Sequence, residues 1–426
     1  MIVINSNVNL LISVIIALVI ILVTARIFMR VAIYFKQPAV VGEMLAGIFL
    51  GPTCFSYFFP ELSSGIFNAD VKSILYVLSN LGLFIFMLLI GMEMKAITKR
   101  SFKEAGMLAV SGIVPPFILG GAISLFLYSK FSYGHISSFA FMLFMGVALA
   151  ITSIPMLARI LQEEGLMRSK LGPLSLTAGS IDDAVAWSFL AIVLAIVNSH
   201  SLLSALSPII FGIIFILVVV YMVKPLMQRL GDKVEKEATL TNASLVLVLI
   251  LTLLTGAITE TIGISAVFGC FVLGMVMPKT EKFQTEIEAK LKDFIIVFFL
   301  PIFFVVSGLN TNLLGLNSIE MLYPFLYILF ASFLGKYGGC TLYMRSLGFS
   351  WRESSAVGGL MNAKGLMELI VVNIGYANGI ISQELYSLLV LMAFITTALA
   401  KPIYNLSMGK GTKEEGRIAN KNLIKG

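Results

Sequence analysis

The chain has 426 residues, of which 58% are hydrophobic and only 12% are charged, and its mean hydropathy is +0.97. This composition excludes a soluble globular protein, because a soluble core cannot bury so much apolar surface, and it predicts an all-α polytopic membrane protein. A net charge of +7 would indicate nucleic-acid binding in a soluble chain, but here it has to be assigned loop by loop, so no nucleic-acid partner is expected. The three cysteines and two histidines show no spacing typical of a disulfide framework or a resident metal, and no cofactor is predicted.

Hydrophobic runs between charged or Pro- and Gly-rich segments predict thirteen membrane spans, the first of which is expected to remain as an uncleaved anchor. The first seven spans are 8–28, 38–56, 71–93, 105–128, 136–160, 173–198 and 203–227. The other six are 240–260, 263–278, 293–314, 320–345, 353–377 and 383–406. Residues 1–406 are therefore predicted to form one transmembrane domain in the lipid bilayer, followed by a short basic cytoplasmic tail, 407–426.

Basic residues are concentrated on one side of these spans. All but four of the 30 lysines and arginines lie in or beside connections that follow odd-numbered spans, or in the C-terminal tail. The exceptions are Lys72, Lys130, Lys336 and Lys364. By the positive-inside rule, the N-terminus is expected outside and the C-terminus in the cytoplasm. This pattern indicates an integral, multi-pass protein of a bacterial inner or plasma membrane.

Matching segments in the two halves indicate an inverted repeat. The glycine pattern that starts at Gly42 in span 2 resembles the one that starts at Gly269 in span 9, and residues 84–94 resemble residues 301–311. Spans 1–6 are therefore predicted to recur as spans 8–13, with span 7 as a linker. Because span 1 enters from outside and span 8 from inside, the halves would be inverted, as in many secondary transporters.

Two corresponding spans carry signals of an interrupted helix. In span 5, Thr152 and Ser153 precede Pro155, which lacks an amide donor, and in span 12, Asn362 and Lys364 interrupt the hydrophobic run. Unwound backbone at this depth is tolerated where protein or a water-filled cavity satisfies it, so such a pair predicts an ion site near the bilayer midplane. A proline kink and a small-residue packing face are the structural alternatives.

Two adjacent acids, Asp182 and Asp183, lie in the middle of span 6. A charge at bilayer depth costs about 2.5 to 3.5 kcal/mol on insertion scales, so these acids are expected to face a cavity or a partner. A buried carboxylate binds a proton or a small hard cation but rarely both, and this competition couples two ion fluxes. Thr152, Ser153 and freed carbonyl groups of span 5 are candidate oxygen ligands.

Basic groups accompany the acids. Lys336 lies in the middle of span 11 among glycines that permit close helix approach, with a snorkelling side chain as the alternative. Lys364 and Glu368 are spaced i, i+4 in span 12, where Lys364 would either compensate carbonyl ends at the interruption or form a structural ion pair. Glu43 in span 2 is expected to lie at the membrane interface or in a local hydrogen bond.

The segments GEMLAGIFLGP, ITSIPMLARIL, GSIDDAVAW, GCFVLGMVMP, LPIFFVVSGLNT and WRESSAVGGLMNAKGLMELIVVNIG together resemble the monovalent cation:proton antiporter-2 family, especially the branch near the plant cation/proton exchangers. The resemblance covers nearly all spans. It implies a 13-span inverted-repeat fold in which discontinuous helices 5 and 12 cross, a homodimer, and an elevator-like motion of a core domain. Relatives that are gated by nucleotide or glutathione carry a cytosolic domain, which the short predicted tail is too small to form, so such gating is not expected.

The resemblance also implies roles for individual residues. Asp183 resembles the essential ion-binding aspartate, Asp182 the acid that pairs with a base on helix 11, and Lys336 that base. Many relatives have Asn at the position of Asp182, and an Asp there resembles the electrogenic type, which exchanges two protons for each cation.

These features favour a secondary active antiporter that exchanges Na+ or K+ for H+, and not an enzyme. A sodium-coupled symporter of an organic anion on a related fold is the alternative, and a channel with a Ser-, Thr- and Gly-lined filter is a further one. An intramembrane aspartyl protease is disfavoured. Its two acids must face each other, whereas adjacent residues on one helix point about 100° apart.

Overall fold

The computed structural model describes residues 6–35, 37–93, 99–132, 136–167, 169–197, 202–237, 239–309, 311 and 319–409. Within these ranges all regular secondary structure is helical, and ten helical stretches, some of them made of two consecutive helices, are long and apolar enough to cross a membrane. The prediction of an all-helical polytopic membrane protein is therefore confirmed. The predicted tail lies outside the described residues except for positions 407–409.

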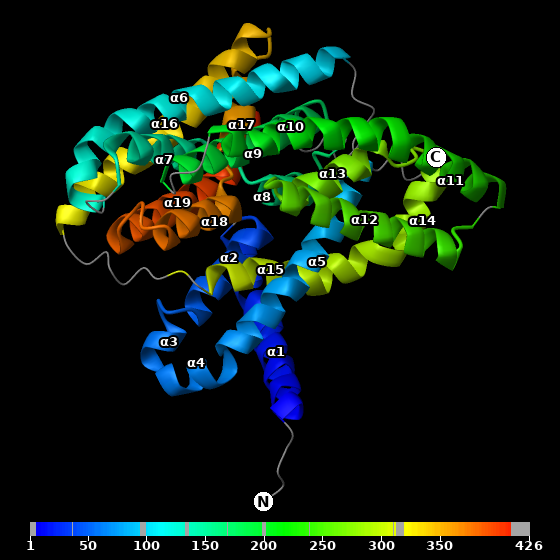
Figure 1. The fold of residues 1–426 in the computed structure, drawn as a ribbon, viewed down its shortest axis with the longest axis horizontal. Helices are drawn as coiled ribbons and strands as arrows, with labels where there is room; N and C mark the ends of the chain where they lie inside the picture. The colour runs from blue at the N-terminus through cyan, green and yellow to red at the C-terminus, as the bar shows by residue number, and fades with distance from the viewer. Residues whose placement is uncertain are drawn as a thin grey trace, which may run out of the picture.

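One group of helices includes spans 2, 3, 9 and 10, whose matching segments indicated the inverted repeat. Its members are α1 (Ser6–Tyr34), α2 (Ala39–Leu50), α3 (Phe55–Phe58), α4 (Pro60–Ile66), α5 (Ala69–Glu93), α12 (Asn242–Ile262), α13 (Ala266–Val276) and α15 (Leu300–Gly308). Helix α2 packs on α1 and α15, while α5 packs on α13 and α15. In Figure 1, α1, α3 and α4 project to one side of the molecule, below α2 and α15.

Two glycine pairs allow the closest helix approaches in this first group. A β-carbon on Gly47 of α2 would lie 2.3 Å from the carbonyl oxygen of Val305 and 2.8 Å from Cα of Gly308 in α15. A β-carbon on Gly274 of α13 would lie 2.2 Å from a carbonyl oxygen of α5 and 2.9 Å from Cα of Gly91. Small residues permit such contact between membrane helices. The segment matches that predicted the repeat align Gly47 with Gly274 and Gly308 with Gly91. The contact of α2 with α15 therefore corresponds, in the repeat, to the contact of α13 with α5.

The second group surrounds the predicted site. It comprises α6 (Lys99–Phe131), α7 (Ser138–Ala150), α8 (Ile154–Glu163), α9 (Leu171–Val197), η4 (Ile319–Met321), α16 (Leu322–Ser346), α17 (Trp351–Met361), α18 (Gly365–Ala377) and α19 (Gln383–Met408). Helix α6 lies against α16 and α7, and α19 packs on α17 and α18 (Figure 1). The largest apolar core lies mainly within this group and extends to α2, α5, α13 and α15.

Two stretches differ from the spans predicted by hydropathy. Span 7 was expected to end at residue 227, but α10 (Leu202–Val218), η1 (Val219–Val223) and α11 (Lys224–Glu237) continue without interruption. Residues 279–292 were expected to form a connection, but they include most of α14 (Glu281–Phe294), which continues through η2 (Ile295–Phe299) into α15. Both predictions were wrong for the same reason. Hydropathy detects segments that can be buried in lipid, so it does not detect a helix that is rich in charged residues.

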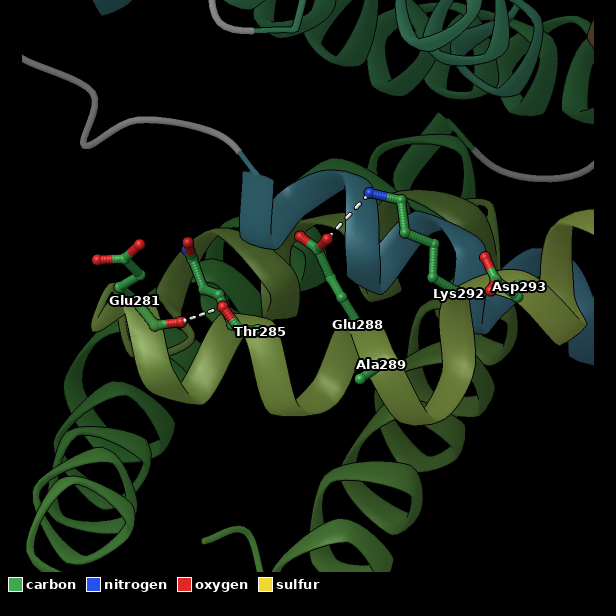
Figure 2. Close-up of a pocket in the computed structure, with 7 residues that line it drawn as sticks. Glu281, Thr285, Glu288, Ala289, Lys292 and Asp293 are labelled. Atoms are coloured by element: carbon green, nitrogen blue, oxygen red, sulfur yellow. Dashed lines mark hydrogen bonds and ion pairs between the residues drawn. The ribbon is translucent and has the colours of Figure 1, made fainter. Parts of the chain in front are cut away.

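Charged side chains of α14 attach it to the end of α5. Lys292 Nζ donates to Glu93 Oε1 at 2.7 Å and to Glu288 Oε2 at 3.0 Å, and Figure 2 shows Lys292 and Glu288 pointing toward each other. Gln284 Nε2 donates to the carbonyl oxygen of Met92 at 2.8 Å. Figure 2 also shows a pocket along this helix, lined by Glu281, Gln284, Thr285, Glu288, Ala289, Lys292 and Asp293.

Candidate ion-binding site

Both predicted interruptions are present. Helix α7 ends at Ala150 and α8 begins at Ile154, with extended backbone at Ile151 and Ser153 between them. Pro155 occupies the first turn of α8, where its missing amide leaves no helix hydrogen bond unmade. Helix α17 ends at Met361 and α18 begins at Gly365.

The two interruptions contact each other through their backbones. The amide of Ser153 donates to the carbonyl oxygen of Ala363 at 2.8 Å, and Thr152 Oγ1 lies 3.1 Å from the carbonyl oxygen of Met361. All four residues are buried. Backbone groups that lack a helical partner are costly at membrane depth, so each interruption stabilises the other by supplying hydrogen-bond partners.

The start of α18 is capped by a hydroxyl group of α19. Thr397 Oγ1 accepts hydrogen bonds from the amide of Lys364 at 3.2 Å and from the amide of Gly365 at 2.8 Å, and it donates to the carbonyl oxygen of Ala393. Gly365 has φ of 45°, a left-handed conformation that glycine adopts without strain. Sequence reasoning missed Thr397, because a single hydroxyl in an apolar span gives no signal of the helix end that it caps.

Two buried lysines satisfy the carbonyl end of α7. Lys364 Nζ donates to the carbonyl oxygens of Leu149 at 2.5 Å and Ile151 at 3.3 Å, while Lys336 Nζ donates to that of Ala150. The last carbonyls of a helix carry partial negative charge and are stabilised by cations. The two lysines thus bind the carbonyl groups of three consecutive residues, 149–151.

The adjacent acids have different surroundings. Asp182 Oδ2 accepts hydrogen bonds from Lys336 Nζ at 2.6 Å and from Thr152 Oγ1 at 2.5 Å. Asp183 is 1% exposed, and its Oδ2 has no hydrogen-bond partner among the described residues. The side chain of Trp187, one helical turn later, is close enough to Asp183 to interact with it. Asp182 is therefore held in an ion pair through Oδ2, although its Oδ1 also lacks a partner, whereas Asp183 has no ion pair among the described residues.

Other predicted site residues add oxygen atoms at the interruptions. Ser153 Oγ and Asn362 Oδ1 are buried and have no partner within the described part of the chain, although Asn362 Nδ2 donates to the carbonyl oxygen of Gly358. Lys364 Nζ lies 3.7 Å from Glu368 Oε2, one turn into α18. Buried oxygen atoms of this kind are the ligands that hard cations prefer.

Glu43 was expected at the membrane interface or in a local hydrogen bond, and the interfacial position is wrong. It is 2% exposed on α2, with Arg159 and Glu163 of α8 as electrostatic neighbours. Glu163 links the same helices, because its Oε2 accepts a hydrogen bond from the amide of Ala39 at 2.9 Å and its Oε1 lies 2.9 Å from Arg159 Nε. Packing of α2 against α8 buries Glu43. The hydropathy of one span cannot predict this contact with another helix.

The fold and the site together define an all-helical, multi-pass membrane protein in which acids and lysines gather at two interrupted helices. The family model described as "Sodium/hydrogen exchanger, transmembrane" matches residues 11–404, and the chain belongs to this family.

Curated relatives have names of the same kind. The chain is 36% identical over 397 residues to the Na(+)/H(+) antiporter NhaS4 of Synechocystis, an alignment that covers 93% of this chain and 97% of the relative. It is 33% identical over 391 residues to cation/H(+) antiporter 15 of Arabidopsis thaliana, covering 91% of this chain and 47% of the relative. It is 29% identical over 383 residues to K(+)/H(+) antiporter 1 of Saccharomyces cerevisiae, covering 87% and 44%. The chain thus spans about half the length of these plant and yeast relatives.

A solved structure has the same fold. The sodium proton antiporter MjNhaP1 from Methanocaldococcus jannaschii, at pH 8, is similar with a TM-score of 0.62 over 92% of this chain and 99% of that chain. The sequence identity is 16%, so this similarity concerns the fold alone.

Proposed function

We propose that this cation/proton antiporter exchanges Na+ or K+ for H+ with Asp183 as the carboxylate that both ions share. One observation carries the proposal: Asp183 is buried beside the two interruptions without an ion pair among the described residues, while the neighbouring Asp182 is paired with Lys336 through Oδ2. A proton and a cation cannot occupy the same oxygen atoms at once, so binding of one releases the other. Alternating access to the site then converts a gradient of one ion into transport of the other.

The surrounding residues have supporting roles in this proposal. Lys336 balances the charge of Asp182 and holds the end of α7, so that Asp183 is the acid left to bind a transported ion. Ser153 and Asn362 provide oxygen ligands, and Thr152 orients Asp182. Lys364 compensates the carbonyl end of α7.

The wider architecture extends the proposal. We infer thirteen spans in an inverted repeat, with the interrupted helices 5 and 12 crossing at the site. The repeat is supported by the two glycine contacts, because the repeat relates the Gly47–Gly308 contact to the Gly274–Gly91 contact. The two helix groups would move against each other like an elevator, with two protons exchanged for each cation. The protein would act as a homodimer in a bacterial inner membrane, with its N-terminus outside and its C-terminus in the cytoplasm.

The test is exchange in inside-out vesicles that hold a proton gradient, followed by a pH-sensitive dye. Addition of Na+ or K+ should restore fluorescence with the wild type and with Asp70→Asn, which changes an exposed acid in the first turn of α5. Asp183→Asn should show no cation-dependent response at an equal amount of protein. Wild-type exchange by Asp183→Asn would overturn the assignment.

A further inference from the structure

Glu368 is a fully buried acid whose carboxylate has no hydrogen bond within the described residues. Both Oε1 and Oε2 lack a partner, and the nearest charged atom is Lys364 Nζ at 3.7 Å. Lys364 donates instead to the carbonyl oxygens of Leu149 and Ile151. The ammonium group therefore balances the charge of Glu368 without donating a proton to it.

The second lysine–acid pair at this helix end is built differently. Asp182 Oδ2 lies 2.6 Å from Lys336 Nζ and also accepts a hydrogen bond from Thr152. A buried carboxylate without donors forfeits the interactions that favour its ionised form. The two pairs thus share the end of α7, but of the two carboxylates only that of Asp182 has hydrogen-bond donors among the described residues.

The surroundings of Glu368 contain few other charges. Lys336 of α16 and Asp182 of α9 act on the Lys364–Glu368 pair electrostatically from farther away. Helices α7 and α15 pack against α18 and contain no titratable residue. Helix α19 also packs on α18, and each of its titratable residues has a neighbour other than Glu368. Lys401 pairs with Glu164 at 2.7 Å, and Tyr404 has Glu164 as its electrostatic neighbour. Glu384 interacts with Ser382, and Tyr386 lies against Tyr376.

We propose that Glu368 is a second proton-binding carboxylate of the exchange cycle, separate from the cation-binding Asp183. This inference rests on the proposed exchange function. The ionised form of Glu368 balances Lys364, and the protonated form leaves the charge of Lys364 to the carbonyl groups of α7. Loading and unloading of this carboxylate would add one proton to the number exchanged for each cation, with no cation bound to Glu368 itself.

The first test is the ratio of protons to cations in proteoliposomes, measured as the cation gradient that balances a fixed pH gradient and membrane potential. Glu368→Gln should lower the ratio by about one proton for each cation, because glutamine has no proton to exchange. Glu320→Gln is the matched control, since Glu320 also lies 3.7 Å from a lysine, Lys130, but is exposed. An unchanged ratio in Glu368→Gln would overturn the inference, whereas absence of exchange in the wild type would overturn the proposed function.

A second measurement does not require turnover. In infrared difference spectra of purified protein taken at several pH values without cation, the wild type should show a pH-dependent C=O band of a protonated carboxyl group at Glu368. This band should be lost in Glu368→Gln and kept in Glu320→Gln and Asp183→Asn. If Glu368→Gln proves inactive, loss of the band still supports the inference, and an unaltered set of carboxyl bands contradicts it.

Discussion

Lys336 and Lys364 reach the same helix end from different parts of the chain. Lys336 of α16 donates to the carbonyl oxygen of Ala150, and Lys364, between α17 and α18, donates to those of Leu149 and Ile151 on either side. Each lysine is accompanied by one acid, Asp182 or Glu368. The unpaired carbonyl groups created by the interruption are thus satisfied by two cations, and the acids reduce the net charge of the site.

The first prediction concerns Lys336→Ala. This variant leaves Asp182 buried without its cation, and removal of one partner from a buried ion pair typically costs about 3 to 5 kcal/mol. We expect a lower midpoint of thermal unfolding in detergent and a changed pH profile of exchange. Adding Asp182→Asn to Lys336→Ala should recover part of the stability, because it removes the unbalanced charge. A single variant as stable as the wild type, with the same pH profile, would contradict this account.

The second prediction concerns the cap on α18. Thr397→Val removes the oxygen that accepts from the amides of Lys364 and Gly365, and a buried unpaired amide costs about 1 to 3 kcal/mol. We expect reduced thermal stability together with reduced exchange, since the cap positions Lys364. The neighbouring Thr396→Val is the control, because Thr396 is equally buried and bonds only to carbonyl groups of its own helix. Equal losses in both variants would show that the cap has no special role.

The third prediction tests the backbone at the start of α18. Gly365→Ala imposes a left-handed conformation on a residue with a side chain and places its β-carbon 2.7 Å from Cε of Met156. Strain of about 1 to 3 kcal/mol is typical of such positions. Gly338→Ala in α16 should be neutral or slightly stabilising, because nothing lies within 4 Å of its added carbon and alanine favours a helix. Thermal unfolding of the two variants should therefore change in different directions or by clearly different amounts.

The fourth prediction is a pH dependence at the connection between α13 and α14. Lys279 Nζ donates to the carbonyl oxygens of Gly91 and Met92, and partial burial lowers the pKa of Lys279 from 10.5 to about 8. Between these pH values the unfolded chain binds one proton more than the folded chain, so the contribution of Lys279 to the free energy of unfolding rises with pH. Below about pH 8 both states are protonated, and the cost of burying the charge is present in full.

The measurement is chemical unfolding of wild type and Lys279→Gln from pH 7 to pH 10. The wild type should gain stability relative to the variant as the pH rises through 8, by less than about 1 kcal/mol because the side chain is partly exposed. A constant difference across this range, or one of opposite sign, would contradict the prediction.

The sequence predicted the fold class, the two interruptions and the residues that gather around them. Runs of apolar residues identify helices in lipid, and a proline or a polar group within such a run marks where a helix stops. The assignment to a cation/proton antiporter family, made from six segments that include those around Asp183 and Lys364, is confirmed by the family match. The roles of the individual site residues and the count of thirteen spans stay predictions.

Contacts between distant segments were not predicted from the sequence. Thr397 and Glu43 matter through what lies opposite them, and α14 is helical although its charges resemble those of a connecting loop. Neither hydropathy nor local spacing records which groups become neighbours after packing.

By itself, the amino-acid sequence determined that the chain enters the membrane, that its helices break near Ser153 and Ala363, and that Asp182 and Asp183 must be kept away from lipid. These outcomes follow from the local cost of exposing polar groups to hydrocarbon. The family resemblance alone suggested that Asp182 pairs with Lys336, and only the tertiary structure decided it: Lys336 Nζ lies 2.6 Å from Asp182 Oδ2, while Asp183 has no ion pair among the described residues. This pairing depends on distances of a few ångströms between side chains of separate helices, and such distances exist only once the helices have packed.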